Sequence, residues 1–223
     1  MKKIVIFGSG AHARVIFSEL VNLKKFKILG FVDDFNKKGK LVIKHGNKNY
    51  YCIGKISEII KKKKVAFSGI IGIGFNYRRK KVYEKVHEIN RNFVWEKVIS
   101  KNAVIVGDVK IGEGSIVVSG AVINSGTSIG NHCMIYTSSS IDHDNTFENF
   151  SSTGPGVVTG GDVVVKEGSH LGIGSVIKHQ VTINKNTVIG GNSFVNKDCD
   201  KNSLYYGNPA TNIKSRNLED TYL

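Results

Sequence analysis

Bulky apolar residues recur at every sixth position through the second half of the chain. Two residues before each of them lies a small or medium-sized residue, from Ala103 to Ser193, so a second row repeats with the same period. Neither a helix nor a flat strand produces this spacing, whereas a solenoid with one inward-pointing aliphatic side chain per flat face does. Fourteen of the sixteen members of the apolar row are bulky and apolar: Ile105, Ile111, Val117, Ile123, Ile129, Ile135, Ile141, Phe147, Thr153, Thr159, Val165, Leu171, Ile177, Ile183, Ile189 and Val195.

Three such faces close a triangular coil, and this hexapeptide pattern is typical of a left-handed parallel β-helix of about five coils. Glycine and asparagine cluster between the apolar positions, where we expect corners with positive φ. These residues are Gly112, Gly114, Gly120, Gly130, Asn131, Gly190, Gly191 and Asn192. A β-sandwich, the alternative, predicts turn signals at intervals of about 8–12 residues and changes of phase. Roughly ninety residues show no such change.

The first half of the chain alternates apolar strands with amphipathic helices, an order typical of α/β domains. The pattern predicts strands at 2–8, 26–35, 50–54 and 68–74, helices at 13–25, 56–64 and 76–90, a glycine turn at 8–13 and a polar segment at 36–49. Residues 93–100 lead into the first coil. We therefore predict a Rossmann-like domain at 1–98, which binds a nucleotide-sugar, and a β-helix at 99–223 that ends in a C-terminal tail.

The glycine turn matches a dinucleotide-binding fingerprint, Gly8-x-Gly10-x-x-Ala13 with Asp33 about twenty residues further on. The backbone N–H groups of such a turn hold a phosphate at a helix N-terminus, and the carboxylate accepts hydrogen bonds from hydroxyl groups. A full dinucleotide domain needs two mononucleotide halves, but fewer than a hundred residues precede the coils. A nucleotide or nucleotide-sugar is therefore favoured over NAD, and a tight turn without a ligand is the third possibility.

Charge divides the chain in the same way. The net charge is +14, with +16 on residues 1–98 and −2 on residues 99–223. A basic half can attract nucleic acid or anionic small molecules. The basic residues form short runs, such as 61–64 and 78–81, without interleaved aromatic residues, so a solvated surface is favoured and no nucleic-acid partner is expected.

Cysteine and hydropathy indicate the compartment. Cys52, Cys133 and Cys199 form no CxxC pair, so neither a disulfide framework nor a zinc cluster is predicted. No window approaches a membrane span, and the apolar run after the first two lysines is too short for a signal peptide. We therefore expect a cytoplasmic protein.

Histidine gives the strongest chemical signal. The solenoid histidines, His132, His143, His170 and His179, lie 11, 27 and 9 residues apart and lack the HxxxxH spacing of a β-helix zinc site, so no metal is predicted. His143 lies between Asp142 and Asp144, just past an inward isoleucine where the chain turns a corner. A flanking carboxylate orients an imidazole and raises its basicity, as a general base requires. A corner histidine without any function is the alternative.

Taken together, the motifs GSGAHARV, VDD and IDHD, the coils and the closing Gly207-Asn208-Pro209-Ala210-Thr211 resemble the bacterial sialic-acid O-acetyltransferase-like family of sugar acyltransferases. That family includes the nucleotide-sugar 4-amino N-acetyltransferases. The resemblance extends from Lys2 to about Lys214. It implies acetyl-CoA as the acetyl donor and a homotrimer, of about 73 kDa for this 24.4 kDa chain, with its sites between neighbouring β-helices.

The resemblance also implies roles for individual residues. His143 corresponds to the catalytic base and Asp144 to its basicity-enhancing partner. The acceptor-binding positions are Gly8, Gly10, Ala11, His12, Asp33 and Asp34, and the acetyl-CoA-binding positions are Ser152, Gly161, Ile173 and Gly191. Ser152 stands where some members have a histidine. Tyr136 replaces the family's asparagine in an Ile-Asn-Thr motif, which affects the predicted sugar pocket.

We therefore expect an acetyl-CoA-dependent N-acetyltransferase that acts on the 4-amino group of a nucleotide-linked amino-deoxysugar in glycan or O-antigen precursor synthesis. The adjacent carboxylates of Asp33 and Asp34 favour a nucleotide-linked acceptor. The alternatives are O-acetylation of sialic acid or another sugar, a non-catalytic nucleotide-binding trimeric scaffold, and an NAD-dependent enzyme. The sequence leaves open which nucleotide, UDP, GDP or dTDP, carries the sugar.

Overall fold

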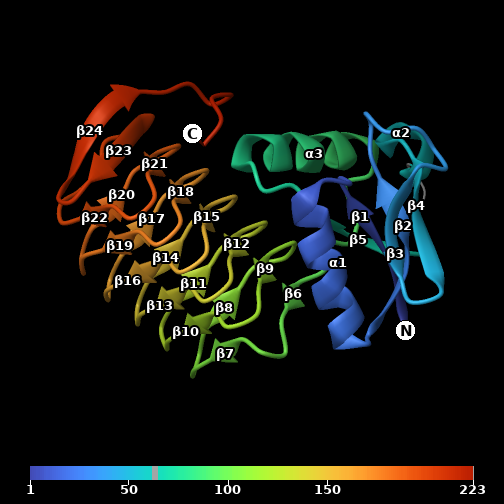
Figure 1. The fold of residues 1–223 in the computed structure, drawn as a ribbon, viewed down its shortest axis with the longest axis horizontal. Coiled ribbons are helices and arrows are strands. Elements are labelled where there is room, and N and C mark those ends of the chain that lie inside the picture. Colours follow the sequence, from blue (N-terminus) through green and yellow to red (C-terminus); the bar gives the residue numbers. More distant parts are fainter. Residues whose placement is uncertain (62–64, 223) are drawn as a thin grey trace. The chain divides into compact units, whose positions relative to one another are not determined.

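The computed structural model describes residues 1–61 and 65–222 and divides into two compact units (Figure 1). Unit 1 consists of Met1–Gly74 and Arg78–Val98, and unit 2 of Phe75–Tyr77 and Ile99–Leu223. No helix in the described part of the chain is both long and apolar enough to span a bilayer.

A five-stranded sheet with the order β3-β4-β2-β1-β5 forms the centre of unit 1. The first elements in chain order are β1 (Lys2–Phe7), α1 (Ala11–Leu23), β2 (Phe26–Val32), β3 (Leu41–His45), β4 (Lys48–Gly54), α2 (Ile56–Ile59), β5 (Ser68–Ile71) and α3 (Asn76–Ile89). All neighbours pair in parallel except β3, which is antiparallel to β4. Strand order reverses at β1, and ligands of open α/β sheets bind beyond the carboxyl ends of the strands at such a reversal.

Burial of apolar residues explains why β1 is central. Four consecutive residues, Ile4 to Phe7, are fully buried, as expected for a parallel strand covered on both faces. The ring of Phe7 packs against Phe93 and Trp95 at centroid distances of 5.7 and 5.2 Å. The amphipathic pattern of α1 buries one face of that helix, including Ile16 and Leu20.

Unit 1 differs from the sequence prediction in several boundaries, including the ends of β2 and β5 at Val32 and Ile71, and in three further details. Strand β3 lies inside the segment predicted to be polar, because Leu41–His45 pairs with β4 in a hairpin. Helix α1 begins at Ala11, two residues early, so Ala11 and His12 belong to its first turn. The predicted helix 56–64 ends at Ile59 because Ile60 is extended, and its residues 62–64 lie outside the described part.

Unit 2 is a parallel β-helix whose short strands form three sheets (Figure 1). The first sheet, named the valine face below, contains β7 (Val104–Ile105), β10 (Val122–Ile123), β13 (Ser140–Ile141), β16 (Val158–Thr159), β19 (Val176–Ile177) and β22 (Phe194–Val195). The second contains β8 (Lys110–Ile111), β11 (Ser128–Ile129), β14 (Thr146–Phe147), β17 (Val164–Val165) and β20 (Thr182–Ile183). The third contains β6 (Val98–Ile99), β9 (Ile116–Val117), β12 (Met134–Ile135), β15 (Ser152–Thr153), β18 (His170–Leu171), β21 (Val188–Ile189), β23 (Ser203–Gly207) and β24 (Ala210–Ser215).

The six-residue period sets the register of the coils. Strand residues of successive coils pair at an offset of 18 positions, as Val122 does with Ser140, up to the last coil, where Val188 pairs with Leu204 at an offset of 16. From Val117 to Val195, every member of the apolar row is at most 3% exposed, and the smaller residues from Ser115 to Ser193 are equally buried. The predicted fold class, a Rossmann-like α/β domain with a hexapeptide β-helix, is thereby confirmed. The predicted tail instead forms a hairpin of β23 and β24.

The corners of the coils differ from the prediction. Positive φ occurs at every sixth residue from Gly114 to Asn192, and eight of these residues are not glycine. Gly112, Gly130, Gly190, Gly191 and Asn131 do not adopt positive φ. At Gly112 the glycine is required for another reason, because a Cβ there would lie 2.5 Å from the carbonyl group of Gly130 on the next coil.

Candidate active site

The His143–Asp144 pair lies at the corner between β13 and β14. Nδ1 of His143 is 2.8 Å from Oδ2 of Asp144, and both side chains are more than half exposed. Asp144 occupies a positive-φ corner position, with φ of 56°. The ring is thus held by its Nδ1 edge, which leaves Nε2 as the basic nitrogen when Nδ1–H donates to the carboxylate.

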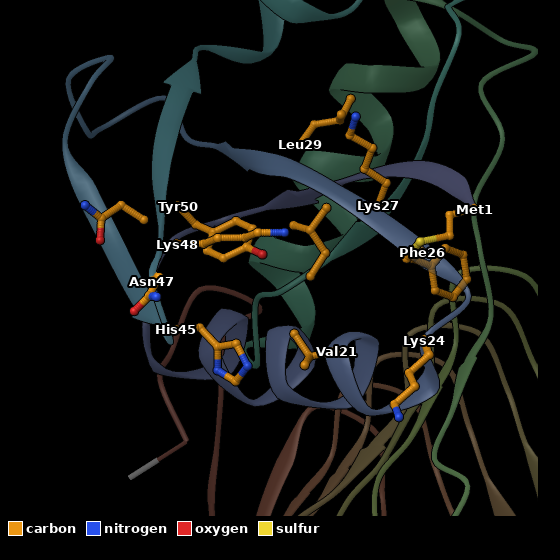
Figure 2. A pocket seen from close by; sticks show the side chains of 12 residues that line it. Met1, Val21, Lys24, Phe26, Lys27, Leu29, His45, Asn47, Lys48 and Tyr50 are labelled. Carbon is orange, nitrogen blue, oxygen red and sulfur yellow. The ribbon is translucent and has the colours of Figure 1, made fainter.

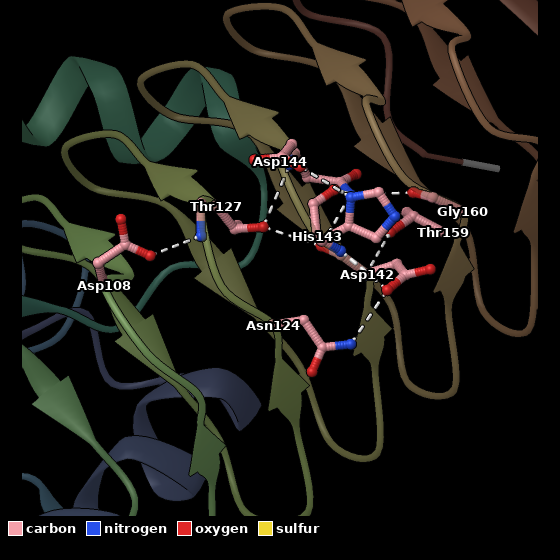
Figure 3. A network of polar contacts seen from close by, with 10 residues as sticks. Asp108, Asn124, Thr127, Asp142, His143, Asp144, Thr159 and Gly160 are labelled. Carbon is pink, nitrogen blue, oxygen red and sulfur yellow. Dashed lines mark hydrogen bonds and ion pairs between the residues drawn. The ribbon is translucent and has the colours of Figure 1, made fainter.

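A buried polar network holds the backbone of this corner from inside the β-helix (Figure 3). Nδ2 of the buried Asn145 donates to the carbonyl oxygens of Asp142, His143 and Gly160, at 2.9 to 3.0 Å. Oγ1 of Thr127 donates to the Asp142 carbonyl, and Oδ1 of Asp142 accepts a bond from the His143 N–H. The exposed His143 side chain is therefore attached to a main chain that these hydrogen bonds hold in place.

Glycines on the two adjacent coils make room for the pair. A Cβ on Gly161, one coil after His143, would lie 2.5 Å from Cε1 and 2.6 Å from Nε2 of the imidazole. A Cβ on Gly126, one coil before Asp144, would collide with the Asp144 carboxylate. Any larger residue at Gly161 must therefore displace the imidazole or its own backbone.

Electrostatics favour a basic imidazole. The hydrogen bond with Asp144 raises the pKa of His143 above its ordinary value, against a smaller desolvation effect, and the charges of Asp142, Asp144 and Asp162 add to the rise. The neutral form that can accept a proton therefore becomes dominant only above this raised pKa.

A backbone N–H near His143 can stabilise an oxyanion, and the candidates after β16 are those of Gly160 and Gly161. The Gly160 N–H donates to the Ile177 carbonyl at 2.9 Å within the coil ladder. Among the described residues the Gly161 N–H makes no hydrogen bond, so Gly161 is the better candidate donor.

The other predicted acetyl-CoA positions lie at different places on the β-helix. Ile173 is 60% exposed at the corner between β18 and β19, and a Cβ on Gly191, one coil later, would contact it. These two residues adjoin each other but lie at a different corner from His143. Tyr136, at the corner that follows β12, is half-buried, and burial raises its pKa to about 12.

Ser152 is buried, and its hydroxyl is engaged within unit 2. It donates to Oδ1 of Asn76 at 2.9 Å and lies 2.8 Å from Nδ1 of His170. The ring of Tyr222 stacks on His170 with centroids 4.1 Å apart. The hydroxyl of Ser152 thus has two partners within the protein. Its role in acetyl-CoA binding stays a prediction.

The glycine turn lies beyond the carboxyl end of β1. Gly8 has φ of +95°, and a Cβ there would contact the side chain of Ile73 at 2.9 Å. Gly10 has ordinary φ, and a Cβ there would meet nothing within 4 Å, so the unliganded fold does not require glycine at this position.

The two carboxylates after β2 are tied into the loops around this turn. Oδ2 of Asp33 accepts from Oγ of Ser9 at 2.5 Å, and its Oδ1 accepts from the N–H groups of Phe35 and Asn36. Burial acts to raise the pKa of Asp33, but these hydrogen bonds together hold it below its ordinary value. Asp34 accepts from the Ile56 N–H at 2.9 Å and from Nζ of Lys85 at 2.6 Å.

His12 lies against the loop that follows β5. A Cβ on Gly74 would collide with its imidazole, and the fully buried Arg79 donates to the carbonyls of Ile73 and Gly74 at 3.0 Å. Burial, and then the charge of Arg79, lower the pKa of His12. His12 is therefore neutral near pH 7.

The structure brings eleven of the twelve predicted residues into three groups: Gly8, Gly10, Ala11, His12, Asp33 and Asp34 at the carboxyl edge of the unit 1 sheet, His143, Asp144 and Gly161 at one β-helix corner, and Ile173 and Gly191 at another. The twelfth, Ser152, is buried on β15 against Asn76 and His170. Sequence reasoning missed Ser9, Asn36, Gly74, Arg79, Gly126 and Asn145. The 18-residue offset between Gly126 and Asp144 was a usable signal for Gly126. No signal pointed to Arg79.

A cavity of about 890 Å³ lies elsewhere in unit 1 (Figure 2). Its lining includes Lys24, Lys27, His45, Lys48 and Tyr50 and none of the predicted site residues. It adjoins the amino end of β2, whereas Asp33 follows the carboxyl end of that strand. In the described part of the chain, no group of three or more His, Cys, Asp or Glu side chains could hold a metal ion.

Known proteins resemble this chain in its N-terminal part and over nearly its whole length. Residues 3–86 match the PglD N-terminal domain family. PerB from Caulobacter crescentus, solved with CoA and GDP-perosamine, superimposes with a TM-score of 0.85 at 27% identity over 96% of this chain and 98% of PerB. A histidine-to-asparagine mutant of perosamine N-acetyltransferase from the same organism gives 0.87 at 26% identity, with the same coverage.

The acetyltransferase domain of PglB from Neisseria gonorrhoeae shares the fold, with a TM-score of 0.84 at 22% identity over 96% of this chain and 100% of the domain. The matches confirm the recognition made from the sequence: the chain has the architecture of a β-helix acetyltransferase. Its residues 3–86 are similar to the PglD N-terminal domain family.

Proposed function

We propose that the protein transfers an acetyl group from acetyl-CoA to the 4-amino group of a nucleotide-linked amino-deoxysugar, as a step in glycan precursor synthesis. The observation that carries the proposal is the exposed His143–Asp144 pair, held at 2.8 Å on a fixed corner of a fold shared with perosamine N-acetyltransferase. PerB, which has been solved with CoA and GDP-perosamine, supports both substrate classes. Nucleotide-sugars and acetyl-CoA are cytoplasmic metabolites, so we place the reaction in the cytoplasm.

Amide formation from a sugar amine defines what the site must do. The amine is mostly protonated near neutral pH and must lose a proton before or during attack on the thioester. Nε2 of His143 takes this proton, while Asp144 holds Nδ1 and stabilises the imidazolium that forms. The Gly161 N–H then stabilises the oxyanion of the tetrahedral intermediate, which collapses to the amide and CoA thiolate. No covalent enzyme intermediate is needed.

Unit 1 provides the acceptor site in this proposal. The turn from Gly8 to Gly10 and the start of α1 bind the diphosphate, because backbone N–H groups at a helix N-terminus attract anions. Oδ2 of Asp33, which accepts one bond from Ser9, is the atom placed to accept a hydrogen bond from a ribose hydroxyl, and neutral His12 adds no charge to this site. The charge of +16 on residues 1–98 draws the anionic substrate toward this unit.

An assay of thiol release from acetyl-CoA tests the function. The acceptors are UDP-, GDP- and dTDP-linked 4-amino-4,6-dideoxysugars, each paired with its 4-hydroxy analogue as a matched control. We expect release with at least one amino sugar and none with the hydroxy analogues. Release with hydroxy sugars alone, or no release with any acceptor, would overturn the proposal.

The valine face supports a trimer. The outward residues of its strands are Val104, Val122, Ser140, Val158, Val176 and Phe194, and three of these valines are at least 40% exposed. The corresponding row of the second sheet is mostly polar, with Lys110, Ser128, Thr146, Val164 and Thr182. A contiguous apolar strip of this kind indicates an interface. We propose that the valine face packs against a second copy and that acetyl-CoA binds between adjacent subunits.

The Val158→Lys variant is expected to dissociate the trimer and to lose thiol release in parallel, because a lysine in an apolar contact must be desolvated without a partner. Thr146→Lys, on the polar sheet, is the matched control and should leave both unchanged. Light scattering measures the mass, with about 73 kDa expected for three 24.4 kDa chains. A fully active monomer would contradict the trimeric site.

A further inference from the structure

Phe35 is an aromatic side chain that the fold leaves in solvent. It is 99% exposed, the highest value among the large apolar residues of the described chain. It follows the carboxylates of Asp33 and Asp34 directly after β2. Exposure of the whole phenyl ring forfeits the free energy that its burial would contribute and leaves both of its faces available to a ligand.

The backbone beneath Phe35 is fixed rather than loose. Its N–H donates to Oδ1 of Asp33 at 2.8 Å, and Oδ2 of the same carboxylate accepts from Ser9 in the glycine turn. Nδ2 of Asn36 donates to the Ser9 hydroxyl at 2.7 Å. The segment that presents the ring is therefore bonded to the turn assigned to the phosphates.

The order of groups along this sheet edge matches the order of groups in a nucleotide. In α/β nucleotide sites the glycine turn holds the phosphates, and the acidic residue at the end of the second strand holds the ribose. The base then lies beyond the ribose, past the acidic residue. Phe35 is two residues past Asp33, on the same fixed loop. The basic residues Lys37 and Lys38 follow it and are exposed.

We propose that Phe35 is the stacking surface for the base of the nucleotide-linked acceptor. This inference rests on the proposed function and deepens it, because it assigns recognition of the base to an aromatic face. Stacking tolerates any base, since every base has a π face. The contact therefore selects for a nucleotide-linked over a free sugar phosphate, while choice among bases depends on edge contacts elsewhere.

Phe35→Ala is expected to raise KM for the nucleotide-sugar and Kd for the matching nucleoside diphosphate by about 5- to 100-fold, the range of a lost base stack. KM for acetyl-CoA should not change, because the ring contacts only the acceptor. Phe35→Tyr and Phe35→Trp should restore affinity, and Phe35→Leu should not. Tyr51→Ala, which removes a 42%-exposed ring elsewhere in unit 1, is the matched control and should match wild type.

Calorimetry with UDP, GDP and dTDP measures nucleotide binding without relying on turnover. It therefore tests base stacking on Phe35 separately from acetyl transfer. If wild type binds a nucleotide tightly and Phe35→Ala weakens that binding, the stacking role stands even where no acceptor is acetylated. Unchanged nucleotide affinity in Phe35→Ala, or full rescue by leucine, overturns the inference and leaves the proposed acetyl transfer intact. An amino-sugar 1-phosphate without the nucleoside should bind wild type and Phe35→Ala equally, and a weaker Phe35→Ala would contradict base stacking.

Discussion

Replacement of His143 by asparagine is expected to lower the turnover number by about 10²- to 10⁴-fold, the usual contribution of a general base. The side chain is more than half exposed and packs into no core layer, so the variant should keep its fold and its affinity for acetyl-CoA. Steady-state assays of CoA release measure the loss. Thermal unfolding and acetyl-CoA calorimetry check that the rest of the protein is unchanged.

Asp144→Asn provides the graded control, because the base stays present while its partner is weakened. The loss should be smaller than for His143→Asn. Since the bond with Asp144 raises the pKa of His143, the fraction of neutral base, and with it kcat/KM, falls as pH decreases through that raised value. In Asp144→Asn this inflection should move to lower pH. Wild-type turnover in the His143 variant would exclude the proposed mechanism.

Gly161→Ala is expected to lower turnover by about tenfold to a hundredfold although no catalytic side chain changes. The added Cβ would lie 2.5 Å from Cε1 of His143, so the imidazole must shift, and displacement of a catalytic group by about 1 Å can cost 10²-fold. The steady-state rate constants of the variant, together with its melting temperature, separate misplacement of the base from unfolding.

The double variant His143→Asn with Gly161→Ala decides whether the glycine acts through the imidazole. If it does, the second substitution should add little once the base is gone, which gives a large coupling energy in the double-mutant cycle. Fully additive losses would show that Gly161 acts on another step, such as acetyl-CoA binding. Wild-type activity in Gly161→Ala would show that the ring does not rest on this glycine during catalysis.

The β-helix was predictable because its signal is periodic and strong. Apolar residues at every sixth position must all point into the β-helix to be buried, so the apolar row fixes how successive coils align. The glycines at the corners were harder to interpret, because a corner glycine can either adopt positive φ or leave room for the backbone of the next coil. Gly114 adopts positive φ, whereas Gly112 allows close approach of the neighbouring coil, and composition does not separate these cases.

Elements in unit 1 that depend on pairing were less predictable. Strand β3 lies among lysines and asparagines, and its short apolar run becomes a strand only because β4 offers an antiparallel partner. In unit 2, the hydroxyl of Ser152 donates to Asn76, which lies 76 residues earlier, so no local sequence pattern indicates this contact.

The His143–Asp144 pair was visible in the sequence because its members are adjacent. Its surroundings were not, since Gly161 and Gly126 meet His143 and Asp144 only through the 18-residue offset between coils. Asn145 occupies the row of small interior residues, and the sequence does not show that its amide binds three carbonyls of the corner.

The most direct measurement identifies the product formed from acetyl-CoA and the best 4-amino nucleotide-sugar, with hydroxylamine treatment to separate amides from esters. For wild type we predict one acetyl group gained by the nucleotide-sugar for each CoA released, in a bond that resists hydroxylamine. With His143→Asn the same product should form about 10²- to 10⁴-fold more slowly. A hydroxylamine-labile ester, or CoA release without an acetylated nucleotide-sugar, would contradict His143-dependent N-acetylation.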